Sequence, residues 1–249
     1  MRDYTTSGNH TVKARTTLRP EYLNLPRDLR ELARGFNLDL PRDCQRDAAV
    51  LVLAIECVDR ILDSLPAAAE RAQFAADVLT SLEGKTPASH NALAKEARER
   101  LSQLHEVIQR RNIGGSFRRI TRRILRNTEQ MRTTRRSAFY VGAAVAEGRW
   151  MVELLLLVLG GAATPRFREF MRQVAGPANL GDKLRDARHD FNLGELAIKP
   201  GVMLHLRLGC GMLWRILALA CRFCAHRRVL SWGLKSLYHE LAWPRQRPA

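Results

Sequence analysis

The chain has few aromatic residues and no cysteine pattern of a secreted protein. Phe, Trp and Tyr make up 6% of its 249 residues, which offers little material for stacking on nucleic-acid bases. Its five cysteines are an odd set without a disulfide-framework spacing, so a reducing compartment is the default. The first 17 residues lack the apolar core of a secretory signal. These absences predict a cytoplasmic protein and argue against nucleic acid as a partner.

Long uncharged apolar runs are also missing. The longest, residues 154–165, is too short to span a membrane. Residues 201–225 are apolar enough to consider, but Arg207, Arg215 and Arg222 interrupt them, so no transmembrane helix is expected. These arginines share one helical face. The segment is therefore either a core helix with an arginine seam or a lipid-facing surface.

Positive charge dominates the chain. Lys and Arg outnumber Asp and Glu by 41 to 25, which gives a net charge of +16. Such a balance indicates a polyanionic partner: nucleic acid, an anionic membrane surface or a phosphorylated substrate. Composition does not choose among the three.

Sparse proline and glycine, together with apolar residues at helical spacing, predict an all-α fold. We expect a single bundle of about eight or nine helices with short connections. Residues 1–40 are predicted to be a flexible basic arm with a short helix near 28–35. Residues 41–243 would form the helical domain and 244–249 a tail. Gly176-Pro177 is expected to separate two helices.

Carboxylates recur every four residues in two segments of this basic chain. Residues four apart lie on one helical face, and like charges at that spacing are mildly destabilising, so each stripe calls for a compensating cation. Mg²⁺ is held by a few carboxylates together with substrate phosphates. The early stripe is Asp59 and Asp63, and the late stripe is Asp182, Asp186 and Asp190.

An Asp-x-x-x-Asp early in a helical chain, followed late by Asn-x-x-Asp-x-x-x-Asp-x-x-x-Asp, resembles the class I isoprenoid synthases. The closest likeness is to the squalene/phytoene-synthase-like and bacterial large-terpene-synthase branches. The late segment, GDKLRDARHDFNLGEL, runs into a Gly-Glu pair whose Glu195 could join the site. The resemblance implies a helical fold, a trinuclear Mg²⁺ site made by the two stripes, and a prenyl diphosphate substrate.

The activity implied by this resemblance is that of a terpene synthase or prenyltransferase. Ionisation of the diphosphate would be followed by cyclisation or coupling, with Asp59, Asp63, Asp182 and Asp186 as catalytic residues. The first stripe lacks adjacent aspartates, which leaves the reaction type open. No family motif supplies the diphosphate-binding basic residues. Lys183 and Arg185 lie nearby in sequence, and the arginine-rich stretch 116–136 could add one or two contacts.

Other interpretations compete with this one. The late stripe could be a solvated acidic face neutralised by Lys183, Arg185 and Arg188. The chain could be a non-catalytic basic protein that binds RNA or an anionic membrane, or a degenerate synthase that serves as a partner subunit. Peripheral association with the inner membrane surface is compatible with each of these functions.

Two further groups of residues are candidates for the site. Cys221, Cys224 and His226 could bind zinc, but the two cysteines fall among apolar helical positions, which favours buried cysteines without a metal. Glu147 and Glu153 flank a tryptophan in an apolar helix. A buried carboxylate needs a partner, so one of them could line the cavity.

Overall fold

A computed structural model describes residues 20–87 and 95–226. These residues form eight α-helices and one short 3₁₀ turn, with no strand among them, which confirms the predicted all-α fold. The helices are α1 (Pro20–Arg34), α2 (Arg42–Ser64), α3 (Ala68–Leu82), α4 (Lys95–Arg111), α5 (Gly114–Thr133), α6 (Ser137–Leu159), α7 (Pro165–Asn192) and α8 (Val202–Arg222); the turn is Gly160–Ala162.

Local signals explain where the principal helices begin and end. Pro41 directly precedes α2, and Pro66 is the second residue beyond its end. Proline therefore bounds the helix on both sides. The hydroxyl of Thr164 accepts a hydrogen bond from the backbone N–H of Phe167 at the start of α7. Gly194, at φ +76°, follows the end of α7 in the left-handed conformation that glycine adopts readily.

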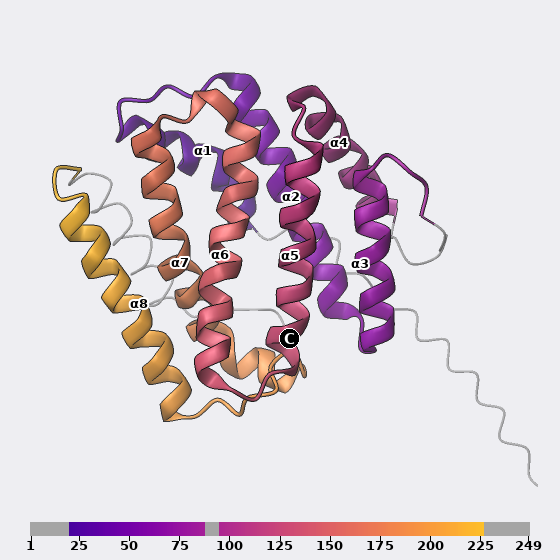
Figure 1. Cartoon of the computed structure of the whole chain (residues 1–249), viewed down its shortest axis with the longest axis vertical. Helices are drawn as coiled ribbons and strands as arrows, with labels where there is room; N and C mark the ends of the chain where they lie inside the picture. Colours follow the sequence, from indigo (N-terminus) through magenta and orange to yellow (C-terminus); the bar gives the residue numbers. More distant parts are fainter. Residues whose placement is uncertain (1–19, 88–94, 227–249) are drawn as a thin grey trace, which may run out of the picture.

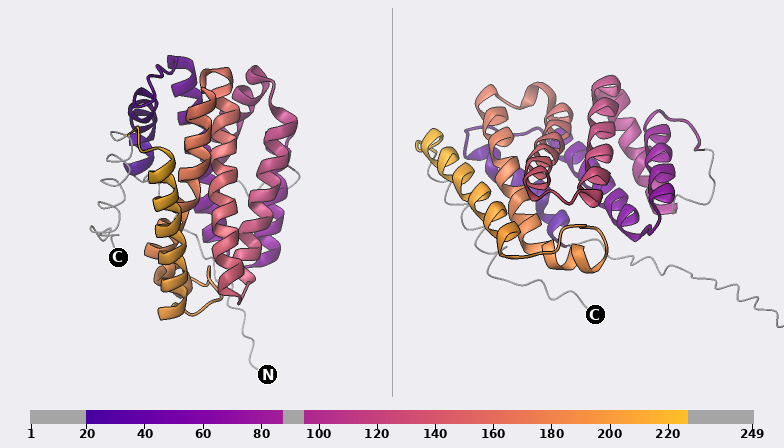
Figure 2. Two further views of the ribbon diagram at one scale, coloured as in Figure 1. Left: turned by 60° about the vertical axis from the view of Figure 1, so that its left-hand side comes forward. Right: turned by 60° about the horizontal axis from the view of Figure 1, so that its bottom comes forward.

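The helices form one bundle around a central interior. Consecutive helices α5, α6, α7 and α8 pack side by side and run up and down in turn (Figure 1). Helix α2 packs against α4 and α6 on the other side of the interior, with α1 on its outer side. Helix α8 lies at the outer edge of the bundle, beside α7 (Figure 2). The interior is therefore enclosed mainly by α2, α4, α5, α6 and α7.

Two apolar clusters hold the bundle together. The larger one joins α1 to α7 and includes the fully buried Phe74, Phe117 and Phe167. The smaller one joins the end of α5 and the beginning of α6 to the second half of α7 and to α8, through residues such as Leu180 and Leu208. Burying side chains of this size contributes about 1.5–3 kcal/mol each.

The structure differs from the sequence prediction in α7, which continues through Gly176 and Pro177 instead of breaking there. Proline removes one helical hydrogen bond, but both residues are buried in the bundle. A Cβ placed on Gly176 would lie 3.2 Å from Val145 of α6 and 3.6 Å from Arg215 of α8. Tertiary packing on both sides thus holds the helix together where local propensity would end it.

The amino-terminal region also differs. The short helix expected near residues 28–35 begins earlier, at Pro20, and its Leu29 and Ala33 are buried. Leu40, between α1 and α2, is buried as well. The stretch from Leu29 to Leu40 therefore packs against the bundle. Residues 1–19 of the predicted arm, and the predicted tail, lie outside the described residues.

Candidate functional site

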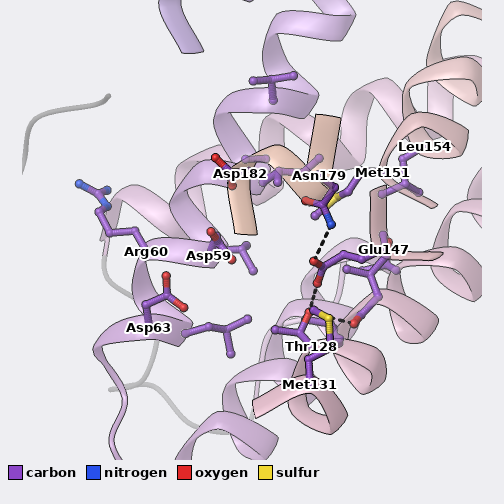
Figure 3. Close-up of a pocket in the computed structure, with 18 of the residues that line it drawn as sticks. Asp59, Arg60, Asp63, Thr128, Met131, Glu147, Met151, Leu154, Asn179 and Asp182 are labelled. Atoms are coloured by element: carbon purple, nitrogen blue, oxygen red, sulfur yellow. Dashed lines mark hydrogen bonds between the residues drawn. The ribbon is translucent and has the colours of Figure 1, made fainter. Parts of the chain in front are cut away.

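A cavity of about 670 Å³ lies inside the bundle and is lined by side chains of α2 to α7 (Figure 3). This volume is within the usual range for small-molecule sites. All five predicted aspartates line it, as do Lys183 and Glu195. The two stripes are more than 100 residues apart in sequence, and the fold brings them to one cavity.

The cavity has a polar end and an apolar end. Its polar lining comes from the last turns of α2, the end of α5, the beginning of α6 and the second half of α7, which meet at one end of the up-and-down bundle. The lining from the beginning of α5, the end of α6 and the beginning of α7 is apolar, and it includes Phe117, Leu154, Leu155 and Met171. The cavity therefore offers a mostly acidic end and an apolar end to a bound molecule.

Asp59 and Asp63 of α2 face the same space as Asp182 of α7 (Figure 3). One helical turn separates the members of each stripe, so both helices present their carboxylates along one side. Asp186 and Asp190 continue the α7 stripe, and all of these residues are at the polar end of the cavity.

The carboxylates of the two helices influence one another. Burial, followed by Asp186 and Asp63, raises the pKa of Asp190 to about 6, although Lys183 acts in the opposite direction. Burial and the carboxylates of Asp63 and Asp190 likewise raise the pKa of Glu195 to about 7. Negative charge is thus disfavoured at this end of the cavity, and a bound cation would relieve the repulsion.

Two arginines already contact the stripes. Arg132, whose side chain is only 10% exposed, donates a hydrogen bond to Asp63 across the α2–α5 interface. Arg185 donates hydrogen bonds to Asp182 and Asp186 on its own helix. Arg185 thus makes the neutralising contacts that the solvated-face interpretation assigned to it, although its side chain is only 14% exposed. Lys183 does not neutralise a solvated face, because its amine approaches Glu147 of α6 inside the bundle.

Lys183 belongs to a network with Glu147 at the polar end. The Lys183 Nζ lies 3.8 Å from the Glu147 carboxylate, which also accepts hydrogen bonds from Thr128 Oγ1 at 2.7 Å and Asn179 Nδ2 at 3.2 Å (Figure 3). Burial alone would lower the pKa of Lys183, but Glu147 and Asp59 help to raise it well above its ordinary value. The amine therefore stays positively charged beside both stripes.

Gly148 makes this network possible. A Cβ at this position would lie 2.5 Å from the carbonyl oxygen of Ala175 and 2.9 Å from Cβ of Asn179, so only glycine fits. The resulting close approach of α6 and α7 lets Asn179 Nδ2 reach the Ala144 carbonyl at 2.6 Å as well as Glu147. The glycine thus fixes the distance between the helices beside the late stripe.

The oxygen-rich lining is chemically suited to Mg²⁺. Among residues 20–87 and 95–226, no three His, Cys, Asp or Glu side chains form a group that could hold a metal ion by themselves. Mg²⁺ usually keeps several waters and uses one or two carboxylates together with substrate phosphates. The raised pKa values of Asp190 and Glu195 show that their negative charges are the ones least favoured at this end of the cavity.

The remaining candidates lie elsewhere. Glu153 forms an ion pair with Arg172 outside the cavity. Cys221 and Cys224 are exposed, so the prediction of buried cysteines was wrong. Cys221 lies on α8, which packs on only one side, and Cys224 lies in the turn that follows α8. No zinc cluster occurs among the described residues.

Sequence reasoning found the two stripes but missed part of the network around them. Asn179 was visible as the first residue of the late pattern, and Arg132 as one of many arginines in residues 116–136. Nothing in the sequence distinguished Arg132 from its neighbours. Thr128 and Gly148 carried no recognisable signal, because their roles depend on contacts between helices.

Comparison of the chain with protein-family models, curated proteins and solved structures finds no match.

Proposed function

We propose that this protein is a Mg²⁺-dependent class I isoprenoid synthase that ionises a prenyl diphosphate and then cyclises or couples the hydrocarbon. One observation carries the proposal. Two aspartate stripes that are remote in sequence line the same end of one cavity, and the other end of that cavity is apolar. A prenyl diphosphate has the same division into a polyanionic head and an apolar chain.

The polar residues divide into two roles. Asp59, Asp63, Asp182, Asp186 and Asp190 would hold the metal ions, with Glu195 beside them. Mg²⁺ at these oxygens would neutralise the charge that develops on the leaving diphosphate. Lys183 would bind diphosphate oxygens directly, because its amine is held in the protonated state at the cavity wall. Arg132 and Arg185 would contribute further positive charge.

The apolar end would bind the hydrocarbon chain and exclude water from the reacting carbons. Phe117, Leu101 and Leu154 are almost completely buried and line this end. Exclusion of water strengthens the electrostatic interactions at the polar end and protects a reactive cation from hydrolysis.

The decisive experiment measures pyrophosphate release from geranyl, farnesyl and geranylgeranyl diphosphates with and without Mg²⁺. Asp59→Asn and Asp182→Asn should each lower the rate by about 100-fold or more, because each removes charge that the metals require. Asp43→Asn is the matched control, since Asp43 lies on α2 but is exposed and outside the cavity. Folded protein that releases no pyrophosphate from any of the three substrates would contradict catalysis.

The arginine contacts favour a second candidate, a degenerate synthase that binds prenyl diphosphates without turnover as a partner subunit. Arg132 and Arg185 already form ion pairs with three of the five aspartates. Calorimetry with farnesyl diphosphate separates the two proposals. Tight binding that does not depend on Mg²⁺, together with no pyrophosphate release, would favour the degenerate synthase.

A further inference from the structure

Large apolar side chains reach solvent in one region of the molecule. Nine such residues are exposed among residues 20–87 and 95–226, and all belong to the beginning of α6, the end of α7 with the residue that follows it, or α8. They are Phe139, Phe191, Leu193, Val202, Met203, Leu206, Leu213, Trp214 and Leu217. An apolar concentration of this kind indicates an interaction surface.

Helix α8 is apolar on two opposite faces. Leu204, Leu208 and Met212 are buried in the smaller apolar cluster. The opposite face carries a stripe that follows helical spacing and includes Trp214, which is 73% exposed. The stripe consists of Met203, Leu206, Leu213, Trp214 and Leu217. We call it the α8 outer face; it lies at the edge of the bundle (Figure 2).

Charge identifies the kind of partner that would cover this face. Helix α8 contains no Asp or Glu, and helical spacing places its exposed Arg207 beside the outer face. Arg222 lies on the side of the helix that faces α7, where it pairs with Glu169. The chain carries a net charge of +16, so a second copy would bring like charge to the same surface. Anionic lipid headgroups would instead attract Arg207 and the positively charged chain. The apolar side chains of the outer face would then enter the acyl region of the bilayer.

The packing of α8 favours a helix that lies along a membrane surface over one that crosses it. By length and composition α8 could span a bilayer, and 22% of its apolar window is buried. However, Leu204, Leu208, Met212 and Leu219 hold it against the bundle at intervals along its length. If α8 crossed the membrane, it would lose these contacts with the bundle, and its arginines would enter the hydrocarbon region.

We propose that the α8 outer face docks on an anionic lipid bilayer as a peripheral membrane surface. The inference stands apart from the proposed reaction, since it rests on exposed residues of α8. Leu193, outside α8, lines the cavity and is 58% exposed, so an exposed apolar side chain also borders the polar end of the site.

Co-sedimentation of the full-length protein with lipid vesicles tests this proposal. We expect binding to vesicles of phosphatidylglycerol and phosphatidylcholine, and much weaker binding to phosphatidylcholine alone. The double substitution Leu213→Glu and Leu217→Glu should weaken binding by at least about tenfold, because it removes apolar contact and adds repulsion. Fluorescence of Trp214 should shift to the blue on binding; Trp214→Phe identifies its share of the signal.

The matched control is Arg119→Gln with Arg123→Gln. Both arginines are exposed on α5, and the pair lowers the net charge by the same amount as the two glutamates do. Binding should change far less in this control. If both double variants lost vesicle binding equally, the attraction would depend on total charge alone, and the proposal would be overturned. Unchanged binding of the glutamate variant would overturn it too, as would wild-type protein that associates with itself and ignores vesicles.

Discussion

The two ends of the cavity differ in what their residues contribute. At the apolar end, side chains such as Phe117 and Leu101 belong to the large core cluster and stabilise the bundle. At the polar end, Asp190 and Glu195 have raised pKa values, because their charged forms are disfavoured in the folded chain. The apolar end therefore supplies stability, whereas the negative charges of Asp190 and Glu195 at the polar end oppose folding.

This difference predicts opposite effects on stability for two kinds of substitution. Removing a side chain from the apolar end should cost stability whether or not ligand is present. Removing the carboxylate of Asp190 or Glu195, whose pKa values are raised, should stabilise the ligand-free protein and weaken metal binding. Single substitutions at each end can therefore test whether the two ends differ in their contribution to stability.

The largest change in stability is expected for Phe117→Ala at the apolar end. Phe117 is 1% exposed and packs in the large cluster, so its loss should lower the free energy of unfolding by about 3 kcal/mol. Urea denaturation monitored by circular dichroism measures the effect. Leu193→Ala, at the exposed margin of the same cavity, is the control and should change it by less than about 0.5 kcal/mol. Similar losses in the free energy of unfolding for both variants would mean that the apolar end does not contribute more stability than the margin of the cavity.

A smaller loss is expected when the internal cation is removed. Lys183→Met leaves Glu147 with its hydrogen bonds from Thr128 and Asn179 but without its positive partner. The free energy of unfolding should fall by about 2 kcal/mol, because the buried carboxylate loses its compensating charge. Adding Glu147→Gln should recover part of this loss in a double-mutant cycle. Strictly additive effects would mean that the two side chains do not interact.

Asp190→Asn should act in the opposite direction. The pKa of Asp190 is raised to about 6 by burial and by neighbouring carboxylates, so its charge opposes folding at neutral pH. After allowance for solvent screening, we expect the ligand-free protein to gain about 1 kcal/mol. Calorimetry should show weaker Mg²⁺ binding by the same variant. A destabilised variant would indicate that Asp190 has a structural partner in the folded state.

The sequence was sufficient to predict the helices and to identify the two stripes, because both depend on residues close together in the chain. The four-residue repeat placed Asp59 with Asp63 on one helical face, and both residues lie on α2. Whether the two stripes share a cavity depends on contacts between α2 and α7, and no local pattern in either helix encodes those contacts.

The errors have the same physical origin. Gly176 and Pro177 predict a break when only their own turn is considered, but α6 and α8 hold that turn in place. Cys221 and Cys224 looked buried because their neighbours in sequence are apolar, yet α8 has an apolar face that the bundle leaves exposed. Local hydrophobicity does not determine which face of an apolar helix is covered.

The smallest expected effect is a pH dependence that reverses the usual behaviour of carboxylates. The folded pKa values of Asp190 and Glu195, about 6 and about 7, lie above their ordinary values, so the folded protein takes up protons before the unfolded chain does. Their stabilising contribution is complete below about pH 4 and is lost as the pH rises through 6 and 7. Without Mg²⁺, the melting temperature should therefore rise by a few degrees from about pH 8 to about pH 5.

Other carboxylates limit this trend on the acid side. Glu129, paired with Arg71, has a lowered pKa, so its contribution is lost at lower pH and stability should fall again there. Saturating Mg²⁺ should flatten the rise between pH 8 and 5, because protons and metal compete for the same oxygens. Melting curves across this range, with and without Mg²⁺, measure both effects, and Asp190→Asn should reduce the metal-free rise. A melting temperature that falls steadily on acidification without Mg²⁺ would mean that these carboxylates are not repelling one another, and the polar end would then resemble an ordinary ion-paired surface.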